Sequence, residues 1–251
     1  MGTVVVDRVV KVYRGVRGGP DLCALNQVSF QVAEGEFCSM LGHSGCGKTT
    51  LLYLIAGFEE PTSGTVMVDG KTITGPGWDR TVVFQDYSLF PWMTVAQNIA
   101  FGLEMKRVAA REREQLVRYY VELVGLTGFE GRYPHELSGG MQQRVALARA
   151  LAVNPRILLM DEPFAAVDAQ TREYLQDELI KIWQVERKTI LFVTHSIAEA
   201  VKLSDRIIVL TRRPGTVKAN LRVDLPRPRR EDDPAVMALR HRIRQLLEAE
   251  S

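Results

Sequence analysis

The 251-residue chain contains few cysteines and no long apolar run. Its three cysteines, Cys23, Cys38 and Cys46, are an odd number without the spacing of a disulfide framework, which predicts reduced thiols in a cytosolic protein. No stretch reaches the ~18 uninterrupted apolar residues that a membrane-spanning helix needs. The N-terminus has no apolar segment after a basic start, so we expect no secretory signal. A function at a membrane would therefore need a second chain to supply the membrane part.

The sequence also lacks a strong excess of charge of either sign. Lys and Arg number 32 against 30 Asp and Glu, which gives a formal net charge of +2. This balance is too mild to predict binding to nucleic acid. With 46% hydrophobic and 25% charged residues, the composition is that of an ordinary globular protein. The length is enough for one large α/β domain, or for one domain with a small helical insert.

Strand-like and helix-like segments alternate along the chain. Residues 4–12 and 28–38 alternate apolar and polar side chains, which predicts strands, and residues 65–73 predict two short strands around a turn at Asp69-Gly70. From Met93 to about Gly140 the pattern is helical and charged, which predicts a helical insert. The later segments predict strands at 156–161, 189–195 and 205–210, and helices at 171–186, 196–204 and about 235–248. Such alternation indicates a mostly parallel sheet with right-handed crossovers.

Residues 42–49, GHSGCGKT, match the pattern G-x-x-x-x-G-K-[ST] between an apolar strand and a helix. The glycines allow backbone amides to turn toward phosphate oxygens, and the following helix adds the positive end of its dipole. Lys48 is expected to reach the β- and γ-phosphates of a nucleotide, and Thr49 to ligate Mg²⁺. Cys46 is a candidate reactive thiol, because a helix N-terminus lowers the pKa of a cysteine.

Polar residues end three other apolar strands. Asp161 stands where P-loop NTPases hold the Mg²⁺ shell, and Glu162 follows it as a candidate general base for the attacking water. Gln85 ends the segment TVVFQ, and its amide could ligate Mg²⁺ or orient water. His195 ends TILFVTH; a γ-phosphate contact at the same edge of the sheet and a purely structural role are both open.

The motifs GHSGCGKTT, VVFQ, LSGGMQQR, ILLMDEP and FVTH follow one another in the order and approximate spacing of ABC-type ATPase domains. The chain resembles that family over nearly its whole length. The resemblance implies an α/β P-loop NTPase with a RecA-like parallel-sheet core, an antiparallel β subdomain and a helical subdomain. It implies an ATPase domain at residues 1–230, with the helical subdomain inserted at about 93–145, and a C-terminal helical tail at 231–251. It also implies that the chain binds and hydrolyses ATP with Mg²⁺.

The same resemblance implies a role for the second glycine-rich turn. ABC domains work as head-to-tail pairs, in which the phosphate loop of one copy faces the signature turn of the other. Ser138, Gly139 and Gly140 are therefore expected to present a hydroxyl and amides to the γ-phosphate bound by the partner. A serine N-cap and two glycines at a helix start suit an anion. The second ATPase subunit is expected to be an identical copy.

Further roles are carried over from the family one position at a time. Tyr13 matches the aromatic residue that stacks on adenine, and Gln85 matches the glutamine that ligates Mg²⁺ and senses the transport partner. Glu162 matches the catalytic glutamate, Asp168 the D-loop aspartate, and His195 the switch histidine. The D-loop reads AAVD where SALD or GALD is more usual. The expected nucleotide-binding residues are Tyr13, Gly42, His43, Ser44, Gly45, Cys46, Gly47, Lys48, Thr49, Thr50, Ser138, Gly139, Gly140 and Asp168, with Glu162, His195 and Gln85 catalytic and Thr49, Gln85 and Asp161 as metal ligands.

Three longer stretches resemble the nitrate, sulfonate and taurine importer subfamily: GPGWDRTVVFQDYSLFPW, DEPFAAVDAQTR, and LTRRPGTV followed by DLPRPR. The resemblance implies a peripheral subunit on the cytoplasmic face of a bacterial inner membrane. Its partners would be an integral membrane permease and, indirectly, a substrate-binding protein. Phe90, Pro91 and Trp92 are candidates for the groove that receives the membrane subunit; packing inside the helical insert is the alternative.

Two other functions stay open at this point. One is a soluble ABC ATPase that acts on nucleic acid or ribosomes, and the other is an exporter ATPase. Each motif occurs once and no long coiled coil separates the two halves, which argues against the soluble class. The transported substrate is not encoded in these motifs. The Pro/Arg-rich residues 225–234 predict an exposed spacer rather than a basic docking arm.

Overall fold

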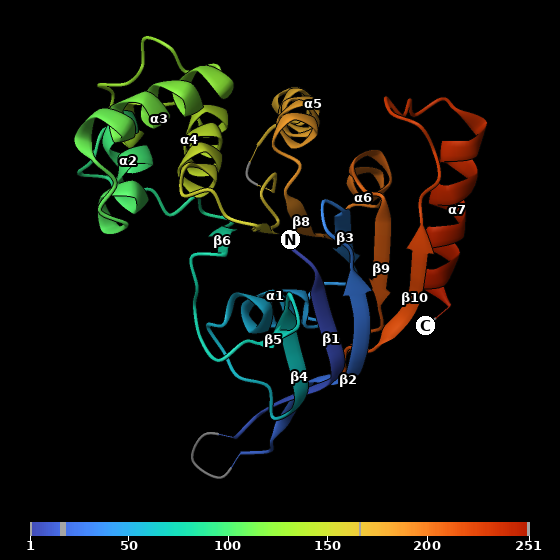
Figure 1. Ribbon diagram of the computed structural model, residues 1–251. Coiled ribbons are helices and arrows are strands. Elements are labelled where there is room, and N and C mark those ends of the chain that lie inside the picture. The colour runs from blue at the N-terminus through green and yellow to red at the C-terminus, as the bar shows by residue number, and fades with distance from the viewer. Residues whose placement is uncertain (1, 16–18, 166, 250–251) are drawn as a thin grey trace. The chain divides into compact units, whose positions relative to one another are not determined.

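The computed structural model describes residues 2–15, 19–165 and 167–249. The chain divides into two compact units (Figure 1). Unit 1 comprises residues 1–77 and 189–251, and unit 2 comprises residues 78–188. No described helix combines the length and the apolar character that a membrane crossing requires.

Unit 1 contains an antiparallel sheet in the order β2-β1-β4-β5. The predicted turn at Asp69-Gly70 is confirmed, with both residues at positive φ between β4 and β5. The prediction of one strand over 28–38 is wrong, because the chain turns at Gly35 (φ 70°) and forms two strands there. The strands are β1 (Val4–Tyr13), β2 (Leu22–Val32), β4 (Ser63–Val68) and β5 (Lys71–Thr72).

The second sheet of unit 1 is built around one fully buried strand. Strand β3 (Phe37–Leu41) pairs in parallel with β8 (Thr189–Thr194) and with β9 (Arg206–Leu210). Strand β10 (Val217–Arg222) pairs antiparallel with β9. Sequence reasoning missed β10, although VKANLR alternates apolar and polar residues, the pattern of a strand with one exposed face. The helices of unit 1 are α1 (Lys48–Ala56), α6 (Ile197–Leu203) and α7 (Pro234–Glu248).

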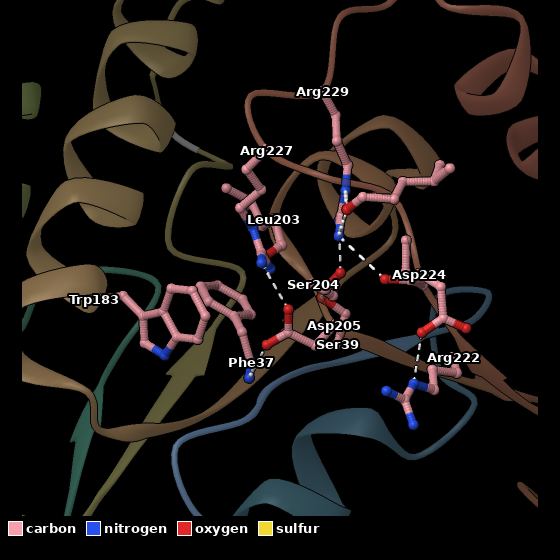
Figure 2. A network of polar contacts seen from close by, with 12 residues as sticks. Phe37, Ser39, Trp183, Leu203, Ser204, Asp205, Arg222, Asp224, Arg227 and Arg229 are labelled. Carbon is pink, nitrogen blue, oxygen red and sulfur yellow. Dashed lines mark hydrogen bonds and ion pairs between the residues drawn. The ribbon is translucent and has the colours of Figure 1, made fainter.

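The C-terminal segment packs into unit 1. Val236 and Ile243 of α7 are buried in a cluster with Val201 of α6 and Val209 of β9. The predicted last helix is confirmed, beginning one residue earlier at Pro234. The predicted exposed spacer at 225–234 is wrong at its centre, because Arg229 is buried against backbone carbonyls (Figure 2). A run of arginines suggested solvent exposure, but the acceptors lie elsewhere in the fold.

Unit 2 contains a parallel strand pair, β6 (Arg80–Val83) and β7 (Ile157–Asp161), and several helices. As the sequence predicted for Met93 to about Gly140, helices form most of the chain between these two strands, joined by loops. Figure 1 shows α2, α3 and α4 grouped together, and α2 and α4 are in extensive contact. A capping box formed by Thr94 and Gln97 begins α2. The helical elements are α2 (Val95–Met105), α3 (Ala110–Leu123), the 3₁₀ turn η2 (Pro134–Glu136), α4 (Gly139–Ala152) and α5 (Ala169–Glu186).

The packing of α7 yields a stability prediction. We expect Ile243→Ala to lower the free energy of unfolding by about 2–5 kcal/mol, because Ile243 is fully buried and its removal leaves a cavity. Met237→Ala, on an exposed part of the same helix, should change it by less than about 0.5 kcal/mol. Urea unfolding of both variants measures this difference. Equal losses of unfolding free energy for the two variants would show that α7 does not pack on the rest of unit 1.

Candidate nucleotide site

The phosphate loop connects β3 to α1 in unit 1. Gly45 and Gly47 have φ values of 76° and 98°, a region that side-chain-bearing residues rarely adopt. Lys48 is buried, and its ammonium nitrogen lies 2.9 Å from the carbonyl oxygen of Gly42 and 3.0 Å from that of His43. These two bonds hold the lysine along the loop, at the start of α1.

The start of α1 fits a phosphate group. Its N-cap is Gly47, which has no side chain to occupy the first amides, and no acidic residue lies in the first turn. Amides at a helix start carry partial positive charge and need acceptors, which phosphate oxygens supply. Ser44, Gly45 and Thr49 are exposed, so the loop is open on one side. The residues present therefore suit a polyphosphate.

The other side of the loop is closed by neighbouring backbone. A Cβ added to Gly47 would lie 2.7 Å from the side chain of Leu25 and 3.0 Å from the carbonyl oxygen of Ala24. A Cβ on Gly215 would lie 2.2 Å from the carbonyl oxygen of Cys46. Gly215 also exchanges backbone hydrogen bonds with the β2 segment. Sequence reasoning missed Gly215, although its Pro-Gly dipeptide is a turn signal.

Cys46 and His43 occupy positions of the phosphate loop that the motif leaves free, and both have contacts that the motif does not predict. Cys46 is only 1% exposed, which contradicts the expectation of an accessible reactive thiol. His43 is half-buried, and its Nε2 lies 3.3 Å from the carbonyl oxygen of Leu247 near the end of α7. The C-terminal helix thus reaches the phosphate loop.

Tyr13 is held beside α1. Its hydroxyl donates to a carboxylate oxygen of Glu59 at 2.7 Å and lies 3.4 Å from the hydroxyl of Thr50. The ammonium of Lys11 sits 5.0 Å from the centre of the Tyr13 ring and forms an ion pair with Glu59. Burial raises the pKa of Tyr13, the Thr50 bond lowers it, and Glu59 raises it further. The ring is therefore fixed next to the helix that follows the phosphate loop.

His195 directly follows β8, the strand beside the one that leads into the phosphate loop. Thr194 at the end of β8 pairs with Leu41 at the end of β3, so His195 and Gly42 leave adjacent ends of parallel strands. His195 is exposed and precedes Ser196, the N-cap of α6. This strand-end placement matches the sequence prediction, since carboxyl ends of neighbouring strands meet at one edge.

Unit 2 brings Gln85 and the acidic pair to adjacent strand ends in the same way. Val83 of β6 pairs with Met160 of β7, and Gln85 and Glu162 follow two residues later on each strand. Asp161 is buried, whereas Gln85 is exposed. Glu162 is half-buried with φ 42°, a backbone conformation that costs about 1–3 kcal/mol and is concentrated at functional sites.

The signature turn lies at the start of α4 in unit 2. Ser138 is its N-cap and accepts a hydrogen bond from the Met141 amide at 3.3 Å. A Cβ on Gly140 would lie 2.8 Å from the methyl of Thr171, so glycine permits close approach to α5. Asp168 caps α5 by accepting from the Thr171 amide, which lowers the pKa of its carboxyl. Ala166 of the AAVD segment lies outside the described residues.

Arg149 of α4 also organises unit 2, and sequence reasoning missed it. Its guanidinium donates to the carbonyls of Ser88 at 2.7 Å and Tyr87 at 2.9 Å, just after Gln85. It also lies 5.4 Å from the centre of the Phe90 ring. Burial lowers the pKa of Arg149, and Asp86 opposes that shift. One helix thus carries both the signature turn and the anchor of the segment after Gln85.

The chain belongs to the ABC transporter family, which it matches over residues 25–165. A dimeric ATP-binding cassette solved in a post-hydrolysis state bound to ADP and Pi superposes with a TM-score of 0.77 at 33% identity, covering 89% of this chain and all of that one. The α/β fold of a P-loop ABC cassette, with its parallel and antiparallel sheets, is confirmed, as are ATP binding and hydrolysis.

Three relatives show how far the likeness extends. An uncharacterized ABC transporter ATP-binding protein of Methanocaldococcus jannaschii is 52% identical over 98% of this chain and 91% of its own. The nitrate import ATP-binding protein NrtD of Synechocystis sp. is 52% identical over 86% of this chain and 80% of its own. The bicarbonate transport ATP-binding protein CmpC of Synechococcus elongatus is 47% identical over 96% of this chain and 37% of its own, longer chain.

The loop geometry yields a matched pair of variants. We expect Gly45→Ala to cost about 1–2 kcal/mol of unfolding free energy, from the left-handed backbone alone, since a Cβ there meets open space. Gly47→Ala should cost at least about 1 kcal/mol more, because its Cβ also contacts Leu25 and the backbone of Ala24. Denaturant unfolding without nucleotide measures both. A smaller loss for Gly47→Ala would contradict the described backing of the loop.

Proposed function

We propose that this chain is the ATPase subunit of an importer for a small anion such as nitrate, sulfonate or taurine. The observation that carries the proposal is the sequence identity of 52% with a nitrate import ATP-binding protein over 86% of this chain. The chain also has the full set of ATPase motifs on an ABC cassette fold. The likeness to a bicarbonate transport subunit supports the same substrate class. In the proposed arrangement the anion passes through the separate permease, so the residues of the ATPase do not choose among anions.

The residues divide the chemistry among them. Lys48 and the amides at the start of α1 bind the phosphates, and Glu162 accepts a proton from the attacking water as general base. His195 contacts the γ-phosphate from the strand end beside Gly42. When bound, Mg²⁺ neutralises charge on the β- and γ-phosphate oxygens, and Thr49, Gln85 and Asp161 are the oxygen ligands that suit it. Tyr13 stacks on the adenine.

Two copies of the chain complete the site head to tail. The start of α4 can bind phosphate through Ser138, Gly139 and Gly140. Each chain already has one such helix start at its own phosphate loop, so the second is available to the nucleotide of the partner. The related cassette of known structure is dimeric. ATP binding stabilises the closed pair and hydrolysis weakens it, which supplies a two-state motion.

The membrane permease receives this motion at the segment after Gln85, with the cassette on the cytoplasmic face. Trp92 is 69% exposed, whereas Phe90 packs at 4.6 Å between ring centres on Phe101. Asn98 fixes the segment 90–94, which contains Trp92, by four hydrogen bonds to backbone atoms of Phe90, Met93 and Thr94. An exposed tryptophan on a rigid support suits a protein contact.

Substitution of the general base tests the catalytic roles. We expect Glu162→Gln to retain ATP affinity and to lower kcat by a factor on the order of 10² or more, because the amide cannot accept the proton. With hydrolysis blocked, ATP should convert the variant to a stable dimer in size-exclusion chromatography with light scattering. Lys48→Ala, which lacks the phosphate cation, serves as the control that stays monomeric. A Glu162→Gln variant that turns over normally would remove Glu162 from the mechanism.

Copurification separates the importer from the alternatives. We expect the tagged chain, isolated from detergent-solubilised membranes, to bring with it a multi-span permease and an anion-binding protein. The matched control is Trp92→Ala, which removes the exposed ring of the proposed contact while leaving the ATPase residues intact. Recovery of ribosomal or chromosomal partners without a membrane protein would assign the chain to the soluble class. A permease without any binding protein would favour an exporter.

A further inference from the structure

Two arginines of the C-terminal segment cover the end of helix α6. Arg227 and Arg229, here called the arginine cap, point toward the last residues of that helix (Figure 2). Arg229 is 7% exposed and donates one hydrogen bond from each of its five N–H groups. The acceptors are the backbone oxygens of Val201 (2.7 Å), Ser204 (2.6 Å), Val223 (3.3 Å) and Leu225 (3.0 and 2.9 Å).

Arg227 extends the contact to the strand that precedes the phosphate loop. It donates to the carbonyl oxygen of Leu203 and forms an ion pair with Asp205 at 2.6 Å. The other carboxylate oxygen of Asp205 accepts from the Phe37 amide of β3 at 3.0 Å. The hydroxyl of Ser204 is also hydrogen-bonded to the hydroxyl of Ser39, in β3. The arginine cap therefore fixes the C-terminal end of α6 against β3.

The chemistry of a helix end explains why arginine is present. The last carbonyls of a helix have no partner within the helix and carry partial negative charge, which a cation stabilises. Val201, Leu203 and Ser204 are such carbonyls at the end of α6. Burial, and then the neighbouring charge of Arg227, lower the pKa of Arg229 to about 10, so its guanidinium stays charged at neutral pH. Five donors in one plane satisfy a set of acceptors that lysine could not.

The opposite end of α6 determines where His195 lies. The helix has only seven residues and begins directly after Ser196. Thr194 accepts from the Ser196 amide at 2.9 Å, and its hydroxyl donates to the buried carboxylate of Glu199 in the first turn of α6. The Thr194 side chain and the Ser196 amide, on either side of His195, are thus hydrogen-bonded to each other, and Thr194 is bonded to the first turn of this helix. A displacement of α6 would carry His195 with it.

We propose that Arg227 and Arg229 are positioning residues for ATP hydrolysis, which act through α6 to hold His195 at the γ-phosphate. The proposal rests on the proposed function, in which His195 makes that contact. The arginine cap does not touch nucleotide itself. It therefore affects turnover rather than ATP affinity, and its effect exists only while His195 is present.

A double-mutant cycle tests this role. We expect Arg229→Met to lower kcat on the order of tenfold while KM and the dissociation constant for ATP change less than about twofold, because a misplaced group loses its transition-state contact. Arg229→Lys, which keeps the charge and part of the hydrogen bonding, should recover part of kcat. Arg230→Met is the matched control, because Arg230 is the adjacent residue and its side chain forms an exposed ion pair with Asp232 instead of bonds to α6. In a His195→Ala background, Arg229→Met should add little further loss.

Each other outcome is decisive. If Arg229→Met lowers kcat equally with and without His195, the arginine cap supports the fold in general and the inference is wrong. If ATP affinity falls as much as kcat, the cap acts on the phosphate loop instead. If His195→Ala leaves kcat unchanged, the proposed role of His195 fails, and the cycle identifies that failure separately. If Arg229→Met does not fold, Arg227→Gln in the same cycle decides by the same criteria.

Discussion

The hydrogen bonds of Lys48 to its own loop fix the conformation of the phosphate loop, around which the other elements of unit 1 are arranged. The lysine can bridge the carbonyls of Gly42 and His43 only because the intervening glycines adopt positive φ and let the chain curl around its ammonium. The buried strand β3 sets where that curl begins, and α1 sets where it ends. Ala24, Leu25 and Gly215 close its outer side. Three segments distant in sequence thus converge on one turn: the loop with its flanking β3 and α1, residues 24–25, and Gly215.

The neighbouring elements can be understood as supports for this turn. β3 has β8 on one side and β9 on the other, so its end is placed together with His195. The C-terminal segment contacts the phosphate loop through Leu247 at His43, and it contacts the far end of α6 through the arginine cap. In unit 2, one side chain supports the functional segments in a similar way. Arg149 of α4 bonds the helix that begins with the signature turn to the segment after Gln85. In the proposed mechanism the site changes state with nucleotide, and these supports keep its groups together during the change.

The sequence predicted the elements whose patterns are local. The phosphate loop, the buried strands 157–161 and 189–194, and the helical insert follow from glycine spacing, apolar runs and helical periodicity. The contacts that failed prediction are those whose partner is remote in sequence. Arg229 appeared to be a solvated residue because its acceptors at Val201 and Ser204 are invisible in the local pattern. β10 and Gly215 were missed although each carries a local signal, an alternating apolar pattern and a Pro-Gly dipeptide. The burial of Cys46, by contrast, depends on packing that no loop motif encodes.

Coupling between anion transport and ATP hydrolysis tests the account most directly. The measurement is the ATPase rate of the chain assembled with its permease in lipid vesicles, with the binding protein and nitrate, sulfonate, taurine or bicarbonate supplied in turn. The account predicts that one of these anions raises the rate several-fold and that Lys48→Ala abolishes the response. A rate that no anion changes, but that RNA or DNA stimulates in the absence of membrane, would contradict it.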